Sequence, residues 1–271
     1  FCKSSSEAGW WIMKQNKKLK LVLLSILGLV LFFGIWECSV RFGLVSERTL
    51  CAPSTALETL FTKMVEKKPD GATIPVHFLA SIKLSLSGFL LAIVIGIPLG
   101  LFMGYYKVLD SLFTPLFEII RPIPPIAWIP IIILTMGIGF NAKVFIIFVS
   151  AFVPCVVNSY LGIKLTNQTL INVAKTFGAS RWQVFTKVCI PSSMNMVFTG
   201  IRISLGNSWS TLVAAEMLAS TQGLGYMIQI GRSLSRPEII IVGMAVIGVT
   251  GAIMSGLLSL CEKKVAPWRY K

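Results

Sequence analysis

The chain has 271 residues, of which 55% are hydrophobic and only 13% are charged. This composition excludes an ordinary soluble domain and predicts an all-α polytopic membrane protein. The net charge of +14 does not indicate a nucleic-acid partner, because the basic residues cluster at the ends of apolar runs and in loops.

The first part of the chain is predicted to be a tail followed by a membrane span. We interpret residues 1–18 as a cytoplasmic tail whose start is open, because MKQNKKLK, from Met13, looks like a translation start. Residues 19–36 form the first predicted transmembrane helix, and no small-residue cleavage site follows it. The N-terminus is placed in the cytoplasm by four lysines before this span: Lys14, Lys17, Lys18 and Lys20.

Residues 37–80 are interpreted as an external segment. An amphipathic helix is predicted from Pro53 to about Glu66, with an apolar face made of Leu57, Leu60, Phe61 and Met64. Cys38 and Cys51 would lie on the same side, either paired in a disulfide or as two free thiols. The lone His77 is expected outside the spans in a structural role, because no partners for a metal site are found.

Residues 81–262 are expected to hold five further spans. They lie at about 81–103, 112–136, 144–161, 194–215 and 239–260. The second span contains a row of glycines that predicts close helix packing: Gly96, Gly100 and Gly104. A short inner turn is expected at 105–110, and an outer segment at 216–237.

The third span is predicted to be a broken helix, because it contains Pro122, Pro124, Pro125 and Pro130. After the last span, residues 263–271 form a basic cytoplasmic tail. Six spans with both termini in the cytoplasm place the polar loop at 163–193 on the cytoplasmic side.

The loop at 163–193 predicts two short helices around a break. An apolar face is made of Leu170, Val173, Ala174 and Phe177. Gly178 is expected to end the first helix in a left-handed conformation. Ser180 with Gln183 forms a capping-box pattern for the second helix, which Pro191 is expected to stop. Such a loop either docks on a partner or lies on the membrane surface.

The segment from Asn172 to Ser180, with Ile190-Pro191, resembles the EAA loop of permease subunits of bacterial ABC importers. It keeps the Ala, Gly and Pro of that pattern at Ala174, Gly178 and Pro191, but Asn172 stands where the family has Glu. The resemblance implies that this loop couples the permease to an ATPase. The implied contact residues are Asn172, Val173, Ala174, Lys175, Phe177, Gly178, Ala179 and Arg181.

Other segments resemble the branch of this family that imports nitrate, sulfonate, taurine and bicarbonate. They are the run RPIPPIAWIP from Arg121, Glu216 with its neighbours, and Gly223-Leu224-Gly225. The resemblance implies a type I ABC importer fold in the bacterial cytoplasmic (inner) membrane. It also implies two permease copies, two ATPase subunits and an external substrate-binding protein. Whether the two permeases are identical is open, although this branch commonly pairs identical copies.

Polar residues at membrane depth are the candidates for a translocation pathway or gate: Glu118, Arg121, Arg202, Asn207, Ser208 and Thr211. An ionisable residue there costs about 2.5–3.5 kcal/mol on insertion scales, so it usually faces protein or water. Glu118 and Arg121 are expected either to pair and hold the broken span or to serve in the pathway. Arg202 is expected to snorkel, to bind carbonyl groups or to act in gating. The hydroxyls either join helices or line a path, and we expect Ser208 and Thr211 to face the dimer axis.

No residues point to catalysis or to a cofactor or metal in this chain. The phosphate-binding pattern GxxxxGK[ST] is absent, so we expect ATP and Mg to be bound by a partner ATPase. We therefore interpret the chain as the permease of an ATP-driven importer for a small, anionic solute. The alternatives are a secondary transporter or channel, which would need inverted repeats or an ion site, and a membrane-bound enzyme, which would need clustered acids or histidines. The solute is left open among nitrate, a sulfonate, taurine, bicarbonate and a neutral vitamin precursor.

Overall fold

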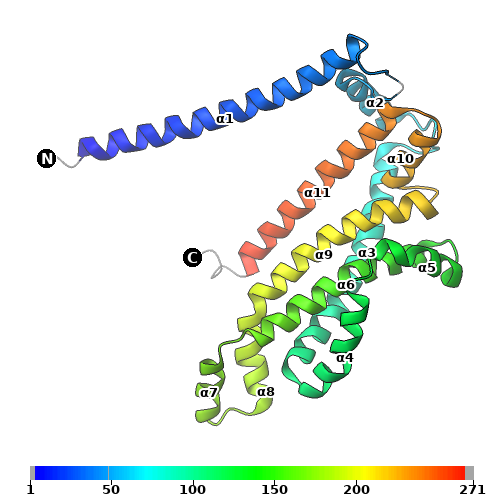
Figure 1. Cartoon of the computed structure of the whole chain (residues 1–271). Helices are drawn as coiled ribbons and strands as arrows, with labels where there is room; N and C mark the ends of the chain where they lie inside the picture. The colour runs from blue at the N-terminus through cyan, green and yellow to red at the C-terminus, as the bar shows by residue number, and fades with distance from the viewer. Residues whose placement is uncertain (1–3, 48, 266–271) are drawn as a thin grey trace. The chain divides into compact units, whose positions relative to one another are not determined.

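The computed structural model describes residues 4–47 and 49–265, and every regular element in these residues is a helix. The chain divides into two compact units. One comprises residues 1–62 and 231–242, and the other comprises residues 63–230 and 243–271. Figure 1 labels the helices.

The first unit begins with α1 (Ser4–Arg41) and includes the start of α2 (Pro53–Val65). The amphipathic helix predicted from Pro53 is confirmed as α2. Glu37 of α1 caps this helix, because its carboxylate accepts the Ser54 backbone N–H at 3.1 Å and the Ser54 hydroxyl at 2.7 Å. Cys38 and Cys51 are free thiols in the structure.

Within the described residues, five helices are long and apolar enough to cross a membrane, and a bent pair makes a sixth candidate. The five cover Leu23–Arg41, Ile74–Tyr105, Phe140–Lys164, Arg181–Leu218 and Pro237–Lys264. This result confirms the predicted all-α membrane fold with about six spans.

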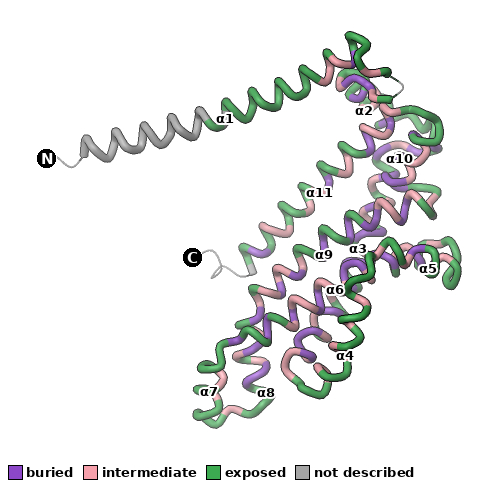
Figure 2. The backbone as a smooth tube through the Cα atoms, in the orientation of Figure 1, coloured by how far each residue is buried: buried purple, intermediate pink, exposed green. Residues whose placement is uncertain are grey.

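The core of the second unit is formed by α3 (Ile74–Tyr105), α6 (Phe140–Lys164) and α9 (Ile190–Ala219), with α6 in contact with both others. Figure 2 shows buried residues along all three helices. The glycine row of α3 faces α6, as expected for close packing. A Cβ added at Gly100 would lie 2.3 Å from the Val156 carbonyl oxygen, and one at Gly104 would lie 2.7 Å from Ile163 Cβ.

The third predicted span is broken, as its prolines indicated. It consists of α4 (Lys107–Ile120), the 3-10 turn η1 (Pro125–Trp128) and α5 (Ile129–Met136), with a bend of 89° between the two halves. The inner turn expected at 105–110 is wrong in extent. Only Tyr106 separates α3 from α4, because one extended residue (φ −98°, ψ 114°) is enough to redirect the chain.

The loop after α6 has the predicted two-helix form. α7 (Gln168–Thr176) ends before Gly178, whose φ of +79° is the left-handed conformation that glycine favours. Ser180 caps α8 (Arg181–Val184) with a complete capping box to Gln183. The local pattern of the loop is therefore confirmed.

The expectation that Pro191 stops the second helix is wrong. The π-helical turn η2 (Phe185–Cys189) joins α8 directly to α9, and Pro191 lies in the first turn of α9. The Ile190 N–H bonds to the Phe185 carbonyl, five residues back, so the wider turn shifts the backbone ladder just before the proline.

The segment predicted at 216–237 is partly helical. It contains α10 (Leu224–Ser233), and α11 (Pro237–Val265) follows. His77, expected outside the spans, lies within α3 and is fully buried.

Candidate functional site

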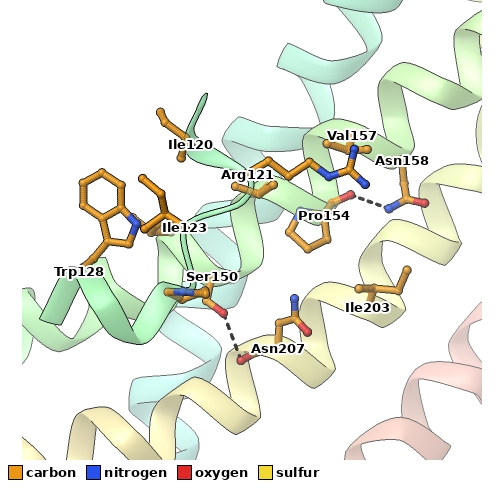
Figure 3. Close-up of a pocket in the computed structure, with 13 residues that line it drawn as sticks. Ile120, Arg121, Ile123, Trp128, Ser150, Pro154, Val157, Asn158, Ile203 and Asn207 are labelled. Atoms are coloured by element: carbon orange, nitrogen blue, oxygen red, sulfur yellow. Dashed lines mark hydrogen bonds between the residues drawn. The ribbon is translucent and has the colours of Figure 1, made fainter. Parts of the chain in front are cut away.

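A pocket of about 310 Å³ lies beside the break of the third span, between η1, α6 and α9 (Figure 3). The prolines end the helical path after Ile120, so the chain crosses α6 as a short irregular link and leaves this space open. Its lining residues are Ile120, Arg121, Ile123, Pro125, Trp128, Val149, Ser150, Val153, Pro154, Val157, Asn158, Ile203 and Asn207.

Arg121 is the charged residue of this lining, which contains no carboxylate. Figure 3 shows its guanidinium extending toward Val157 and Asn158 of α6, while the Asn207 amide projects from α9 and the Trp128 indole lies at the other end. Asn158 donates to the Pro154 carbonyl at 2.9 Å, so part of its hydrogen-bonding capacity is already used.

Three other donors in the lining have no acceptor within the part of the chain that is described. The Arg121 guanidinium and the Asn207 side-chain amide are exposed and make no hydrogen bond or ion pair there. The Trp128 indole N–H is buried and has no partner. The exposed donors of the pocket are therefore Arg121 and Asn207, whereas the Trp128 N–H is closed off from it.

The expected pathway residues divide into two groups. Arg121 and Asn207 line the pocket, whereas Ser208 and Thr211 are buried inside the subunit. The Ser208 hydroxyl donates to the Leu205 carbonyl at 2.8 Å, and the Thr211 hydroxyl lies 2.7 Å from the Ser150 hydroxyl. The Thr211 hydroxyl thus joins α9 to α6, whereas the Ser208 hydroxyl bonds within its own helix, and neither faces an open path within this subunit.

The remaining pair, Glu118 and Arg121, does not form the expected ion pair, because α4 ends at Ile120 and the Arg121 side chain turns toward α6. Arg202 instead forms an ion pair with Glu262 of α11, whose side chain is almost fully buried. The sequence reasoning did not identify Glu262 as its partner, because 60 residues separate the two.

A buried polar network at the start of α3 was not anticipated. The Lys63 ammonium and His77 Nε2 lie against the two carboxylate oxygens of Asp70, with a distance of 3.1 Å for the histidine. His77 Nδ1 accepts the Gly223 backbone N–H at 3.0 Å. One turn further along α3, the Ser81 hydroxyl accepts the Leu224 N–H at 2.8 Å.

Glu216 completes this network from the end of α9. Its carboxylate accepts the Ser81 hydroxyl at 2.8 Å and the Gly225 N–H at 2.9 Å. Three successive N–H groups at the start of α10 are thus satisfied by side chains of α3 and α9. A Cβ at Gly223 would lie 2.3 Å from Glu216 Cδ, which explains why glycine is needed there. The available sequence signal was the acid Glu216 followed by Gly223 and Gly225.

The predicted coupling surface is formed by the loop helices α7 and α8. Its apolar side chains are strongly exposed, with 52% of Leu170, 47% of Val173, 87% of Phe177 and 56% of Trp182 accessible. The expected contact residues Asn172, Lys175, Gly178 and Arg181 are also exposed. Ala174 and Ala179 are half-buried and face their own subunit, so the predicted single apolar face is divided between the subunit and the exterior.

An aromatic cluster fixes this surface to the membrane core. Phe185 is 2% exposed and packs against Phe102 and Tyr105 of α3, with ring centroids 5.3 and 4.9 Å apart. The Tyr105 hydroxyl donates to the Arg181 carbonyl at 2.7 Å. Contacts of Phe185 and Arg181 thus connect this loop to the end of α3, and η2 joins α8 to α9.

Comparison with known proteins places this geometry in a family. The model of the family "Binding-protein-dependent transport system inner membrane component" matches residues 96–267. The taurine transport system permease protein of Escherichia coli is 33% identical over 91% of this chain and 90% of its own length. The nitrate import permease protein of Leptolyngbya laminosa is 29% identical over 93% of this chain and 90% of its own.

A solved structure of an amino acid ABC transporter with histidines has the same fold, with a TM-score of 0.56 at 18% identity. The match covers 70% of this chain and 94% of that chain. The family model spans more than half of the chain, and the relatives carry the permease names that the sequence motifs predicted. The chain therefore belongs to the family of inner membrane components of binding-protein-dependent transport systems, the permease subunits of ABC transporters.

Proposed function

We propose that this chain is the permease of an ATP-driven importer in which separate subunits bind ATP and Mg and hydrolyse the nucleotide. The observation that carries the proposal is the exposed apolar surface of α7 and α8, which is anchored to the spans by Phe185. An exposed aromatic such as Phe177 beside other apolar groups is typical of a docking site for another protein. The family supports an ATPase as the occupant.

The transported solute in this proposal is small and carries an oxyanion group, such as a sulfonate or nitrate. The support comes from two relatives named for taurine transport and nitrate import. An external binding protein delivers the solute. Two copies of this chain and two ATPase subunits form the complex, in the bacterial cytoplasmic membrane and with both termini in the cytoplasm.

Replacing Phe177 by Ala tests the ATPase contact. We expect the ATPase subunit to bind the variant about 30-fold more weakly, since loss of a central aromatic anchor commonly costs about 2 kcal/mol. Co-purification of the two subunits at graded ATPase concentrations measures the affinity, and uptake into vesicles measures transport. Uptake should fall in parallel with binding.

Phe61→Ala is the matched control, because Phe61 is 72% exposed on α2 and lies outside the coupling surface. It should leave the ATPase affinity unchanged. Unchanged binding and transport in the Phe177 variant would remove the coupling assignment. Solute uptake by the chain without any ATPase subunit would favour the rival reading, a transporter that is not coupled to ATP.

A further inference from the structure

We propose that the pocket between η1, α6 and α9 is a binding site for the oxyanion of the transported solute, with Arg121 as its charged contact. This inference rests on the proposed function, because it assigns a place in the permease to the solute. It goes further by naming the residues that contact the solute and the charge that they select.

The charge of the pocket lining favours an anionic solute. Arg121 lines the pocket, no carboxylate does, and its guanidinium has no partner among the described residues. The walls are mainly apolar side chains such as Val153 and Ile203, so the positive charge acts in a medium of lower dielectric than water. A planar guanidinium binds oxyanions through parallel N–H donors. A cationic solute would find no counter-charge here.

Neutral hydrogen-bond donors also lie at the pocket. The Trp128 indole N–H is buried without an acceptor, and the Asn207 amide faces the same pocket (Figure 3). An anion in the pocket offers an acceptor oxygen to the exposed Asn207 amide. The Arg121 guanidinium comes from the link after α4 and the Asn207 amide from α9, so a pocket lined by both depends on the break of the third span.

The size of the pocket and the expected strength of binding suit a small solute in transit. A volume of about 310 Å³ is at the small end of the range of ligand pockets, about 300–1,000 Å³, which suits a solute of a few heavy atoms. Arg121 is exposed, and one cation with one neutral donor binds an anion weakly. A transit site needs such weak binding, because the solute must also leave.

The test measures charge selection inside the pocket and needs no knowledge of the natural solute. Ile203, 44% exposed in the lining, is replaced by Cys in the complete complex with its ATPase. The rates of modification by 2-sulfonatoethyl and by 2-(trimethylammonio)ethyl methanethiosulfonate are then compared by peptide mass spectrometry. We expect the anionic reagent to be favoured, and the ratio of the two rates to fall by about tenfold or more when Arg121→Gln is added.

Ile131→Cys in α5 is the matched control, because Ile131 is 54% exposed and does not line the pocket. Arg121→Gln should leave its rate ratio unchanged, and Arg121→Lys should keep the anion preference at position 203. An equal ratio with and without Arg121 would overturn the proposal, as would no reaction at position 203 in either the resting or the ATP-bound state. Failure of the proposed function would show separately, as loss of the ATPase subunit from the wild-type complex.

Discussion

Asp70 joins a buried lysine to the only histidine of the chain, just before the first residue of α3. Burial raises the pKa of Asp70, but hydrogen bonds and charge interactions with His77 and Lys63 together lower it by a larger amount. The net pKa of Asp70 therefore lies below its usual value. A carboxyl whose folded pKa is depressed contributes stability above its unfolded pKa of about 4, and this contribution is lost as pH falls through the folded value.

We expect Asp70→Asn to lower the free energy of unfolding by about 3 kcal/mol, because Lys63 would stay buried without a counter-charge. The double variant with Lys63→Met should be less destabilised than the single variant. The measurement is the thermal midpoint of the purified complex at pH 7, and again below pH 4, where the difference between wild type and Asp70→Asn should shrink. If the double variant unfolds at a lower temperature than the single variant, the Lys63–Asp70 pair is not what stabilises the chain before α3.

At the scale of elements, α3 and α6 are held together by small residues and α8 is joined to α9 by a π-helical turn. The glycine row lets the backbones of α3 and α6 approach closely, because no side chain stands between them. The favourable packing of the two helices therefore depends on these positions staying without a side chain. The turn η2 keeps α8 and α9 in one continuous helix that reaches from the coupling surface into the membrane core.

Gly100→Ala should destabilise the permease by about 1–3 kcal/mol through overpacking, because the new Cβ would meet the Val156 carbonyl oxygen at 2.3 Å and Ser159 Cβ at 2.8 Å. Gly256→Ala in α11 is the control, since no atom lies within 4 Å of its added Cβ. Thermal midpoints of both variants in detergent decide the matter. Similar thermal midpoints for the two variants would mean that α6 can shift away from the added methyl group at little cost in free energy.

At the scale of the whole molecule, the chain exposes many large apolar side chains on helices that are long enough to cross a membrane. Lipid covers part of this surface in the proposed location. The rest is available for a second permease copy, and a closed two-fold assembly would present two equal coupling surfaces to two equal ATPases.

We predict that the permease pair is a homodimer. Native mass spectrometry of the complex should show two copies of this chain with two ATPase subunits. The physical reason is that, around a two-fold axis, each copy buries the same surface patch against the other, so no second kind of permease is needed. Recovery of a second, different permease in equal amount would contradict this prediction, while leaving the ATPase contact at Phe177 unaffected.

The sequence by itself determined the features that depend on neighbouring residues. Apolar runs predicted the spans, the prolines after Ile120 predicted the break, and Gly178 with Ser180 predicted the two-helix loop, because each signal acts within a few residues. Pro191 is the local exception, since the π-helical turn before it was not visible as a pattern.

The tertiary structure alone decided which distant residues meet. His77 and Ser81 contact the loop at 223–225, and Glu216 lies 135 residues from Ser81, so no local spacing could have indicated their network. The burial of Ser208, the exposure of Asn207 and the place of Arg121 in a pocket depend on how three elements pack. Helix periodicity gives the relative angles of side chains on one helix, but only packing decides which face meets lipid, protein or an open pocket.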